Sequence, residues 1–158
     1  MSDDRCPECG ASAGGRAGCR AIFDEMSAHA YADSAYGAVH DLVVDAYSMQ
    51  HPNEHGRSAK SYAAHLTRLC CALEFGADPT VYAAIPRWMN GSVAPPRPES
   101  LSRRGLLTIA DVHTARTGEE HKRLVRAWAE KVWEAYAPQH ELAREWIRSA
   151  LATPKSRA

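Results

Sequence analysis

The chain has 158 residues, of which 45% are hydrophobic, and its 19 basic side chains balance its 19 acidic ones. This length suits one domain with one hydrophobic core. The zero net charge creates no overall field that attracts phosphate polymers, so we expect no nucleic-acid partner. The polar N-terminus lacks a secretory leader, and no stretch reaches the roughly 18 apolar residues of a membrane span, so we expect a cytoplasmic protein without membrane contact.

The N-terminus carries a pattern typical of metal binding. Cys6 and Cys9 stand in the run Cys-Pro-Glu-Cys-Gly, and Cys19 follows shortly afterwards. Two thiolates at this spacing form half of a tetrahedral zinc site. The chain has five cysteines, an odd number, and no export signal, which favours metal ligation over a disulfide framework. The alternative is that these are ordinary thiols in a loose N-terminal segment.

A closed zinc site needs a fourth ligand, which can come from one of eight histidines. His51 is the best candidate because it ends a predicted helix, on the same face as His40, Val44 and Tyr47. Alternatively, His51 forms hydrogen bonds only to the backbone at that helix end. We therefore expect Zn²⁺ to be bound by Cys6, Cys9, Cys19 and His51.

Apolar residues recur three to four positions apart along the first half of the chain, which predicts helices. The glycine-rich residues 10–18 are expected to form a flexible loop that returns Cys19 to the other cysteines. His51 to Gly56 is expected to be a turn, because a residue before proline avoids the helical region. The predicted helices cover about residues 19–31, 34–50 and 58–75, with a short helix from Pro79 that ends at Pro86.

The second half of the chain predicts a connection followed by more helices. Residues 92–105 are rich in proline and predict an extended connection or a lid over a pocket, with Arg103 and Arg104 exposed to solvent. A short helix is expected at Thr108, a long one over about residues 118–136, and a final one before the tail. We therefore predict an all-α fold: an irregular bundle of about five to seven helices with an N-terminal zinc-knuckle-like segment. It forms a single domain over residues 1–158, with a metal-binding segment at 1–20 and a flexible tail at 153–158.

Three further side chains are candidates for acid–base catalysis. His121 occupies a position on the apolar stripe of its predicted helix, and His65 flanks the stripe of another. A buried imidazole needs partners for its nitrogens, so each histidine indicates a polar neighbour, a metal or a satisfied core position. If they converge with Asp45, His51 and Asp111 inside the bundle, an imidazole can act as general base and a carboxylate can orient it. The candidate catalytic residues are Asp45, His65 and His121.

Several blocks of the sequence resemble a small bacterial family of unknown function. They are Cys6-Pro-Glu-Cys-Gly, Val44-Asp-Ala-Tyr-Ser-Met-Gln-His-Pro, Ala64-His-Leu-Thr-Arg-Leu-Cys and Leu107-Thr-Ile-Ala-Asp-Val, followed by Glu120-His121 and Trp128. The resemblance covers about residues 6–147, and it departs at residues 12–18, where family members often carry a longer, aromatic-containing loop. It supplies no activity. It implies that the family pattern includes Cys6, Cys9, Cys19, Asp45, Gln50, His51, His65, Asp111 and His121.

Two functions follow from these patterns. The first is a zinc-binding helical protein that acts by binding or regulation, with the metal in a structural role. The second is a small zinc-dependent enzyme of the hydrolase or lyase type, with an open metal position and acid–base residues. In either case a small molecule is a possible ligand. A zinc-knuckle module for nucleic acid would require strongly salt-dependent binding, which the neutral charge disfavours.

Overall fold

Helices dominate the computed structural model, which describes residues 4–91, 95–102 and 104–155. Within these ranges the chain forms nine α-helices, one 3-10 turn and no strand, so the predicted all-α fold is confirmed. The number exceeds the prediction because short helices separate the long ones. The elements are α1 (Gly15–Ala32), α2 (Ser34–Ala38), α3 (His40–Gln50), α4 (Pro52–His55), α5 (Ala59–Glu74), α6 (Pro79–Met89), α7 (Ile109–Val112), α8 (Gly118–Ala135), η1 (Ala137–Gln139) and α9 (His140–Ala152).

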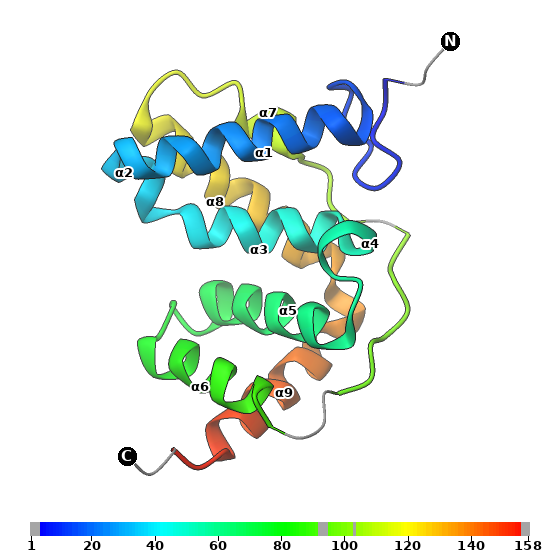
Figure 1. Cartoon of the computed structure of the whole chain (residues 1–158), viewed down its shortest axis with the longest axis vertical. Coiled ribbons are helices and arrows are strands. Elements are labelled where there is room, and N and C mark those ends of the chain that lie inside the picture. Colours follow the sequence, from blue (N-terminus) through cyan, green and yellow to red (C-terminus); the bar gives the residue numbers. More distant parts are fainter. Residues whose placement is uncertain (1–3, 92–94, 103, 156–158) are drawn as a thin grey trace.

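The helices are stacked along the longest axis of the molecule (Figure 1). α1 and α2 lie at one end, α3 and α5 occupy the middle, and α6 packs against α9 at the other end. α8 crosses behind α3 and contacts it. From residue 95 the chain returns along one side of the stack to α7, which packs against α1 and α8. This return segment, residues 95–102 and 104–108, passes beside α4 and the end of α3, where the candidate site lies.

Side-chain caps start several of these helices close to the predicted helix starts. Ser58 accepts a hydrogen bond from the backbone N–H of Ser61 at the start of α5. Asp78 accepts one from Thr80 before the N1 proline of α6, and Thr117 accepts one from Glu120 at the start of α8. Each cap satisfies a backbone donor that has no partner within the helix. The complete capping box forms at α7, between Thr108 and Asp111.

Two predicted helices differ from the structure at their ends. α1 begins at Gly15 instead of residue 19, so the predicted flexible loop over residues 10–18 is partly helical. The helix expected over residues 34–50 is divided at Val39, whose φ of −115° and ψ of 9° interrupt the helical backbone. The hydrophobic periodicity of the sequence continues across Val39, so the pattern does not reveal this break in the helix. The turn predicted after His51 contains the single-turn helix α4.

Pro86 does not end α6, which continues to Met89. A proline removes one backbone donor, but its fixed φ fits a helix, and the apolar face can outweigh the lost bond. Val81, Ile85 and Met89 are all buried on that face. The prediction that Pro86 limits this helix was therefore wrong.

One hydrophobic core runs through the stack, and Trp128, Tyr47, Tyr62 and Tyr136 are among its largest fully buried side chains. The extended connection expected over residues 92–105 has no regular structure where it is described, at residues 95–102, 104 and 105. Residues 1–3, 92–94, 103 and 156–158, the last belonging to the predicted tail, lie outside the described residues. In the part that is described, no helix has the length and hydropathy needed to cross a membrane.

Candidate metal centre

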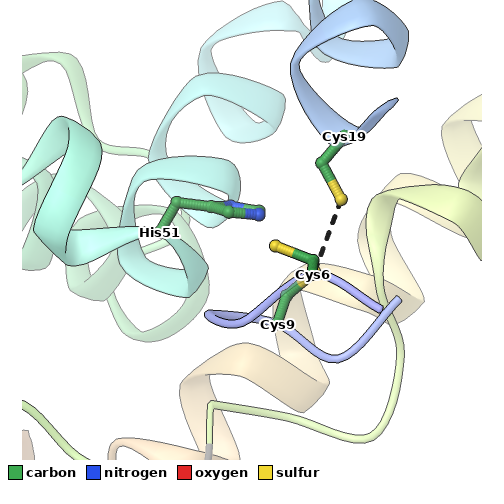
Figure 2. A group of neighbouring side chains, drawn as sticks. All are labelled: Cys6, Cys9, Cys19 and His51. Atoms are coloured by element: carbon green, nitrogen blue, oxygen red, sulfur yellow. Dashed lines mark hydrogen bonds between the residues drawn. The ribbon is translucent and has the colours of Figure 1, made fainter. Parts of the chain in front are cut away.

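The first cysteine pair lies in a compact turn. Arg5 and Ser12 form an antiparallel bridge, and the N–H of Cys6 donates to the carbonyl of Ala11 at 2.9 Å. Inside this small hairpin, the N–H of Gly10 donates to the carbonyl of Cys6 at 2.9 Å. Gly10 has a φ of +81°, a conformation that glycine adopts without steric cost. We call residues 5–12 the knuckle, since the turn directs the Cys6 and Cys9 sulfurs to one side (Figure 2).

Cys19 reaches the same place from the first turns of α1. The knuckle packs closely on this helix, because the N–H of Gly15 donates to the carbonyl of Asp4 at 2.8 Å. A Cβ atom at Gly18 would lie 1.7 Å from the carbonyl oxygen of Ala13. The glycine next to Cys19 therefore allows the close approach that brings Cys19 to the knuckle.

Replacing Gly18 with alanine should disturb this contact. The added methyl group collides with backbone, so either the knuckle or the start of α1 must move, and we expect a loss of about 2 kcal/mol or more of unfolding free energy. If the centre binds zinc, its affinity should fall as well, because Cys19 moves relative to Cys6. Thermal unfolding and zinc titration measure the two effects. Gly91→Ala, at an exposed position after α6, is the control, and equal behaviour of the two variants would contradict the expectation.

His51 follows the last turn of α3, and its ring is fixed from two directions. Its Nδ1 lies 2.8 Å from the carbonyl oxygen of Tyr47, which accepts a hydrogen bond only if Nδ1 carries the proton. The imidazole also stacks on the Tyr47 ring, with centroids 4.0 Å apart, and Tyr47 stacks in turn on Phe23 at 4.4 Å. The other nitrogen, Nε2, is therefore left with a lone pair that points toward the cysteines (Figure 2).

Cys6, Cys9, Cys19 and His51 meet at one point. One donor atom from each side chain lies within 4.8 Å of every other. The Cys9 and Cys19 sulfurs are 3.6 Å apart, too far for a disulfide and close to the roughly 3.8 Å expected for two sulfurs bound to one tetrahedral zinc ion. The four residues can hold a metal ion, so the predicted set is brought together as expected.

The Nε2 atom of His51 is the strongest sign of a bound ion. It is buried and has no hydrogen-bond partner within the described residues. A buried polar atom without a partner costs free energy, so native proteins rarely contain one without a reason. A metal ion between His51 and the three sulfurs would satisfy this lone pair.

Burial disfavours the charged forms of three of the candidate ligands, Cys9, Cys19 and His51. It raises the pKa of the Cys9 thiol to about 11, and it raises the pKa of Cys19 further, with the Cys9 thiol acting in the same direction. Burial also lowers the pKa of His51 below its ordinary value. The imidazole is thus ready to bind a cation at neutral pH, whereas the thiols must release protons when a metal binds.

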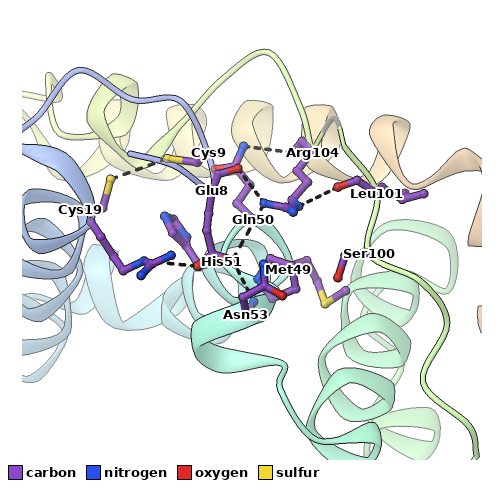
Figure 3. A network of polar contacts seen from close by, with 12 residues as sticks. Glu8, Cys9, Cys19, Met49, Gln50, His51, Asn53, Ser100, Leu101 and Arg104 are labelled. Atoms are coloured by element: carbon purple, nitrogen blue, oxygen red, sulfur yellow. Dashed lines mark hydrogen bonds and ion pairs between the residues drawn. The ribbon is translucent and has the colours of Figure 1, made fainter. Parts of the chain in front are cut away.

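Glu8 ties the knuckle to α4 and to the return segment. Its side chain is 2% exposed, and its Oε1 accepts a hydrogen bond from the backbone N–H of Asn53 at 2.8 Å. Arg104 donates from Nη1 to the carbonyl oxygen of Glu8 at 2.7 Å and from Nε to the carbonyl of Leu101 at 2.9 Å (Figure 3). Arg104 was expected to be solvated, but its side chain is only 11% exposed. That expectation was wrong. The sequence of a loop does not indicate which backbone carbonyl groups will accept hydrogen bonds from an arginine within it.

Gln50, the neighbour of His51, connects three segments. Its amide nitrogen donates to the carbonyl oxygens of Arg104 at 3.0 Å and Leu107 at 2.6 Å. Its amide oxygen accepts the indole N–H of Trp128 at 2.9 Å. Gln50 is completely buried. The side chain therefore fixes the end of α3, and with it His51, to α8 and the return segment.

A cavity of about 740 Å³ lies against the knuckle. Residues 6–10 form one wall, residues 102 and 104–106 a second, and Lys131, Glu134 and Ala135 at the end of α8 a third. Ligand pockets commonly have volumes of about 300–1,000 Å³, so this one is large enough for a small organic molecule. Part of the predicted connection, for which a lid was the alternative, thus lines a cavity beside the candidate metal centre.

Asp45 and His65 form a separate polar group between α3 and α5. His65 Nδ1 lies 2.9 Å from Asp45 Oδ1, and Arg68 Nε lies 3.2 Å from Asp45 Oδ2. Asp45 is 1% exposed, and burial raises the pKa of its carboxyl group, while His65 and Arg68 favour the charged form. The structure brings together two of the three predicted catalytic residues in a carboxylate–imidazole pair. Their catalytic role stays a prediction.

His121 lies elsewhere, in a small pocket of about 130 Å³ between α1, α2, α7 and α8. Its ring stacks on Tyr36 with centroids 3.7 Å apart. Within the described residues, no hydrogen bond or ion pair joins it to Asp45 or His65. Asp111 does not enter an interior cluster either, because its exposed carboxylate accepts the Thr108 N–H at 2.8 Å and caps α7. Asp111 therefore does not take part in the convergence that was considered for the acid–base residues, because its carboxylate caps α7 at the surface.

The His121 environment predicts a pH dependence of stability. Burial lowers the pKa of His121 below its ordinary value of 6.5, and His29 acts in the same direction. Below about pH 6.5, His121 takes up a proton more readily in the unfolded chain than in the folded one. The free energy of unfolding should therefore decrease as the pH is lowered. His121→Gln removes this titration. We expect its melting temperature to drop less than that of the wild type between about pH 7 and about pH 5, and an equal drop would contradict the assignment.

Taken together, the fold and the site define an all-α protein with a candidate Cys₃His metal centre. The chain belongs to the family described as "Family of unknown function (DUF5946)", whose profile matches residues 4–137. The resemblance found in the sequence was also to a family of unknown function. That resemblance extended to about residue 147, whereas the family profile ends at residue 137. No curated protein and no solved structure matches the chain.

Proposed function

We propose that this is a zinc-stabilised helical protein that acts by binding or regulation, with Zn²⁺ held by Cys6, Cys9, Cys19 and His51. The unpartnered Nε2 atom of His51, facing three sulfurs, carries the proposal. Three thiolates and one imidazole form a common zinc ligand set, and softer ligands of this kind disfavour Mg²⁺ and Ca²⁺. We also place the protein in the cytoplasm, where reducing conditions keep thiols available as ligands.

The metal in this proposal is structural. Four protein ligands complete a tetrahedron and leave no position for a substrate. Cys6, Cys19 and His51 are each at most 2% exposed, and they come from the knuckle, α1 and the end of α3. An ion bound there would join three segments that are distant in sequence, so its binding free energy would contribute to folding.

Metal removal tests the proposal. Purified protein should contain about one zinc ion per chain, and a chelator should lower its melting temperature reversibly. Elemental analysis and thermal unfolding with and without added zinc measure both results. Cobalt substitution adds a check, because tetrahedral thiolate coordination gives strong visible absorption. Metal-free protein with unchanged melting would contradict the proposal.

A second candidate function, acid–base catalysis, rests on the Asp45–His65 pair. A buried carboxylate at 2.9 Å fixes the imidazole with its proton on Nδ1 and leaves Nε2 as the basic nitrogen. Within the described residues, no hydrogen bond occupies that Nε2. A hydrolase and lyase substrate screen with wild type and His65→Gln tests this role. Activity that the variant lacks, with folding and zinc content unchanged, would support it, and inactivity of both proteins would count against it.

A further inference from the structure

A second pocket gathers side chains of the types that bind metal ions. It lies where α1, α2, α7 and α8 meet at one end of the stack (Figure 1), and its volume is about 130 Å³. Three of the eight histidines of the chain line it together with one carboxylate: His29, His113, His121 and Glu25. Among the described residues that line it there is no lysine, arginine or cysteine. We call this space the histidine pocket.

The ring of His121 forms the buried wall of the histidine pocket. The residue is 1% exposed, and within the described chain no hydrogen bond reaches its nitrogens. These nitrogens are not among the atoms that the protein encloses without a partner, so they open onto the pocket that the residue lines. The Tyr36 ring holds the imidazole in place, with centroids 3.7 Å apart. Buried polar groups are almost always partnered, and a bound water or ion commonly explains an exception.

Glu25 and His113 already stand close to the separation of two metal ligands. Nε2 of His113, the residue after α7, lies 2.9 Å from Oε2 of Glu25 on α1. Two donor atoms that bind one ion at about 2.1 Å are roughly 3.0–3.4 Å apart in octahedral and tetrahedral sites. His29 stands four residues after Glu25, so it projects from the same face of α1. α1 thus supplies two candidate ligands, and the end of α7 supplies a third.

We propose that the histidine pocket is a second metal site, for a divalent transition-metal ion of the zinc, cobalt or nickel type, bound by Glu25, His29, His113 and His121. Imidazole suits these ions, whereas Mg²⁺ and Ca²⁺ prefer sites built from oxygen ligands. The site goes beyond the cysteine centre proposed above and does not depend on it. His29 follows Cys19 by ten residues on α1, which is about 15 Å along the helix.

The charges around the pocket favour a cation over an anion. Burial raises the pKa of Tyr36, and the carboxylates of Asp33 and Glu25 act in the same direction, so both carboxylates influence the space that Tyr36 lines. Burial also lowers the pKa of His121, so its imidazole is neutral at neutral pH. A neutral imidazole beside carboxylates can bind a metal ion without first losing a proton.

Binding requires the exposed ligands to turn inward. The cysteine centre is the only group of the described residues whose donor atoms all lie within 4.8 Å of one another. The His29 ring lies against Tyr36, with centroids 4.6 Å apart, and must turn toward Glu25. The side chains of Glu25 and His113 are 60% and 46% exposed, and exposed side chains change rotamer readily. His121 stays fixed by its stacking, so a bound ion would join α1 and the end of α7 to α8.

Cobalt binding by the full chain tests the second site. Co²⁺ bound by thiolates absorbs strongly in the visible range, whereas Co²⁺ bound by imidazole and carboxylate absorbs weakly. The chain is saturated with Co²⁺ and dialysed, and bound cobalt is determined by elemental analysis beside the absorption spectrum. We expect about two cobalt ions per chain, with thiolate absorption that saturates after about one.

Two substitutions remove pocket ligands at exposed positions, where the fold should tolerate them. Glu25→Gln and His113→Gln should each lower the cobalt affinity of the pocket by more than about tenfold, because losing even a residue that only orients a ligand has an effect of that size. His40→Gln is the matched control. It removes a histidine that does not line the pocket, so both ions should stay bound.

The outcomes separate this site from the cysteine centre. Cobalt that binds without thiolate absorption, is lost in both pocket variants and is kept in His40→Gln supports the second site. If thiolate absorption is absent as well, only the cysteine centre is contradicted. Cobalt that always appears with thiolate absorption overturns the second site and leaves the cysteine centre standing. Uptake without thiolate absorption that is equal in all variants also overturns it, and a chain that binds no cobalt contradicts both.

Discussion

We expect the replacement of His51 with alanine to abolish stoichiometric zinc binding. The substitution removes one of four ligands and leaves three sulfurs, and it also deletes a completely buried ring that stacks on Tyr47. If the wild type is measured with free zinc at about a thousand times its dissociation constant, the lost linkage alone is about 4 kcal/mol. For a chain of this size that corresponds to a fall of roughly 8–16 °C in melting temperature.

His51→Cys is the matched control for this prediction. It restores a fourth zinc ligand of a suitable type, so it should retain zinc although it loses the ring stacking. Zinc titration and thermal unfolding of the wild type and both variants, each with and without chelator, separate metal binding from packing. An alanine variant that binds zinc as tightly as the wild type would show that His51 is not a ligand.

The second large effect is expected at Gln50. Gln50→Leu keeps the approximate volume but removes three hydrogen bonds, and it leaves the Trp128 N–H and the carbonyls of Arg104 and Leu107 without that partner. Each buried group without a partner costs about 1–3 kcal/mol, so we expect a loss of about 3 kcal/mol or more. Chemical denaturation of the zinc-loaded protein measures it.

Met49→Leu is the control for Gln50→Leu. Met49 is equally buried and precedes Gln50 on α3, but the exchange conserves volume and should cost less than about 1.5 kcal/mol. Zinc affinity of Gln50→Leu should also fall, because the network that positions His51 is broken. A Gln50 variant as stable as the Met49 variant would show that the hydrogen bonds to the return segment contribute little.

The meeting of the four candidate metal ligands was predictable because their residue types are chemically distinctive. Cys6 and Cys9 show the spacing of a zinc turn, and Cys19 follows closely, so only the fourth ligand had to be inferred. His51 could be chosen because it ends a helix beside a proline. Glu8, which packs beside the same centre, was not assigned there. It stands between the two cysteines, and its residue type indicates no second role at that position.

The predicted catalytic group illustrates the opposite case. Asp45, His65, His121 and Asp111 were each notable as polar residues in or near helices, but no spacing relates residues on different helices to one another. The structure pairs Asp45 with His65, places His121 against Tyr36 and leaves Asp111 as a helix cap. Whether such residues meet depends on how the helices are rotated and stacked.

The sequence by itself determined the helical class and indicated the candidate ligand set, because apolar periodicity and cysteine spacing are local properties that few other structures satisfy. Only the tertiary structure decided which polar residues share a site, where α1 begins and which residues line the cavity beside the knuckle. These depend on contacts that reach beyond a single helix, such as Gly15 with Asp4 at the start of α1 and Arg104 with Glu8 beside the cavity. Such contacts are set by the packing of the whole core, whose shape no short stretch of sequence records.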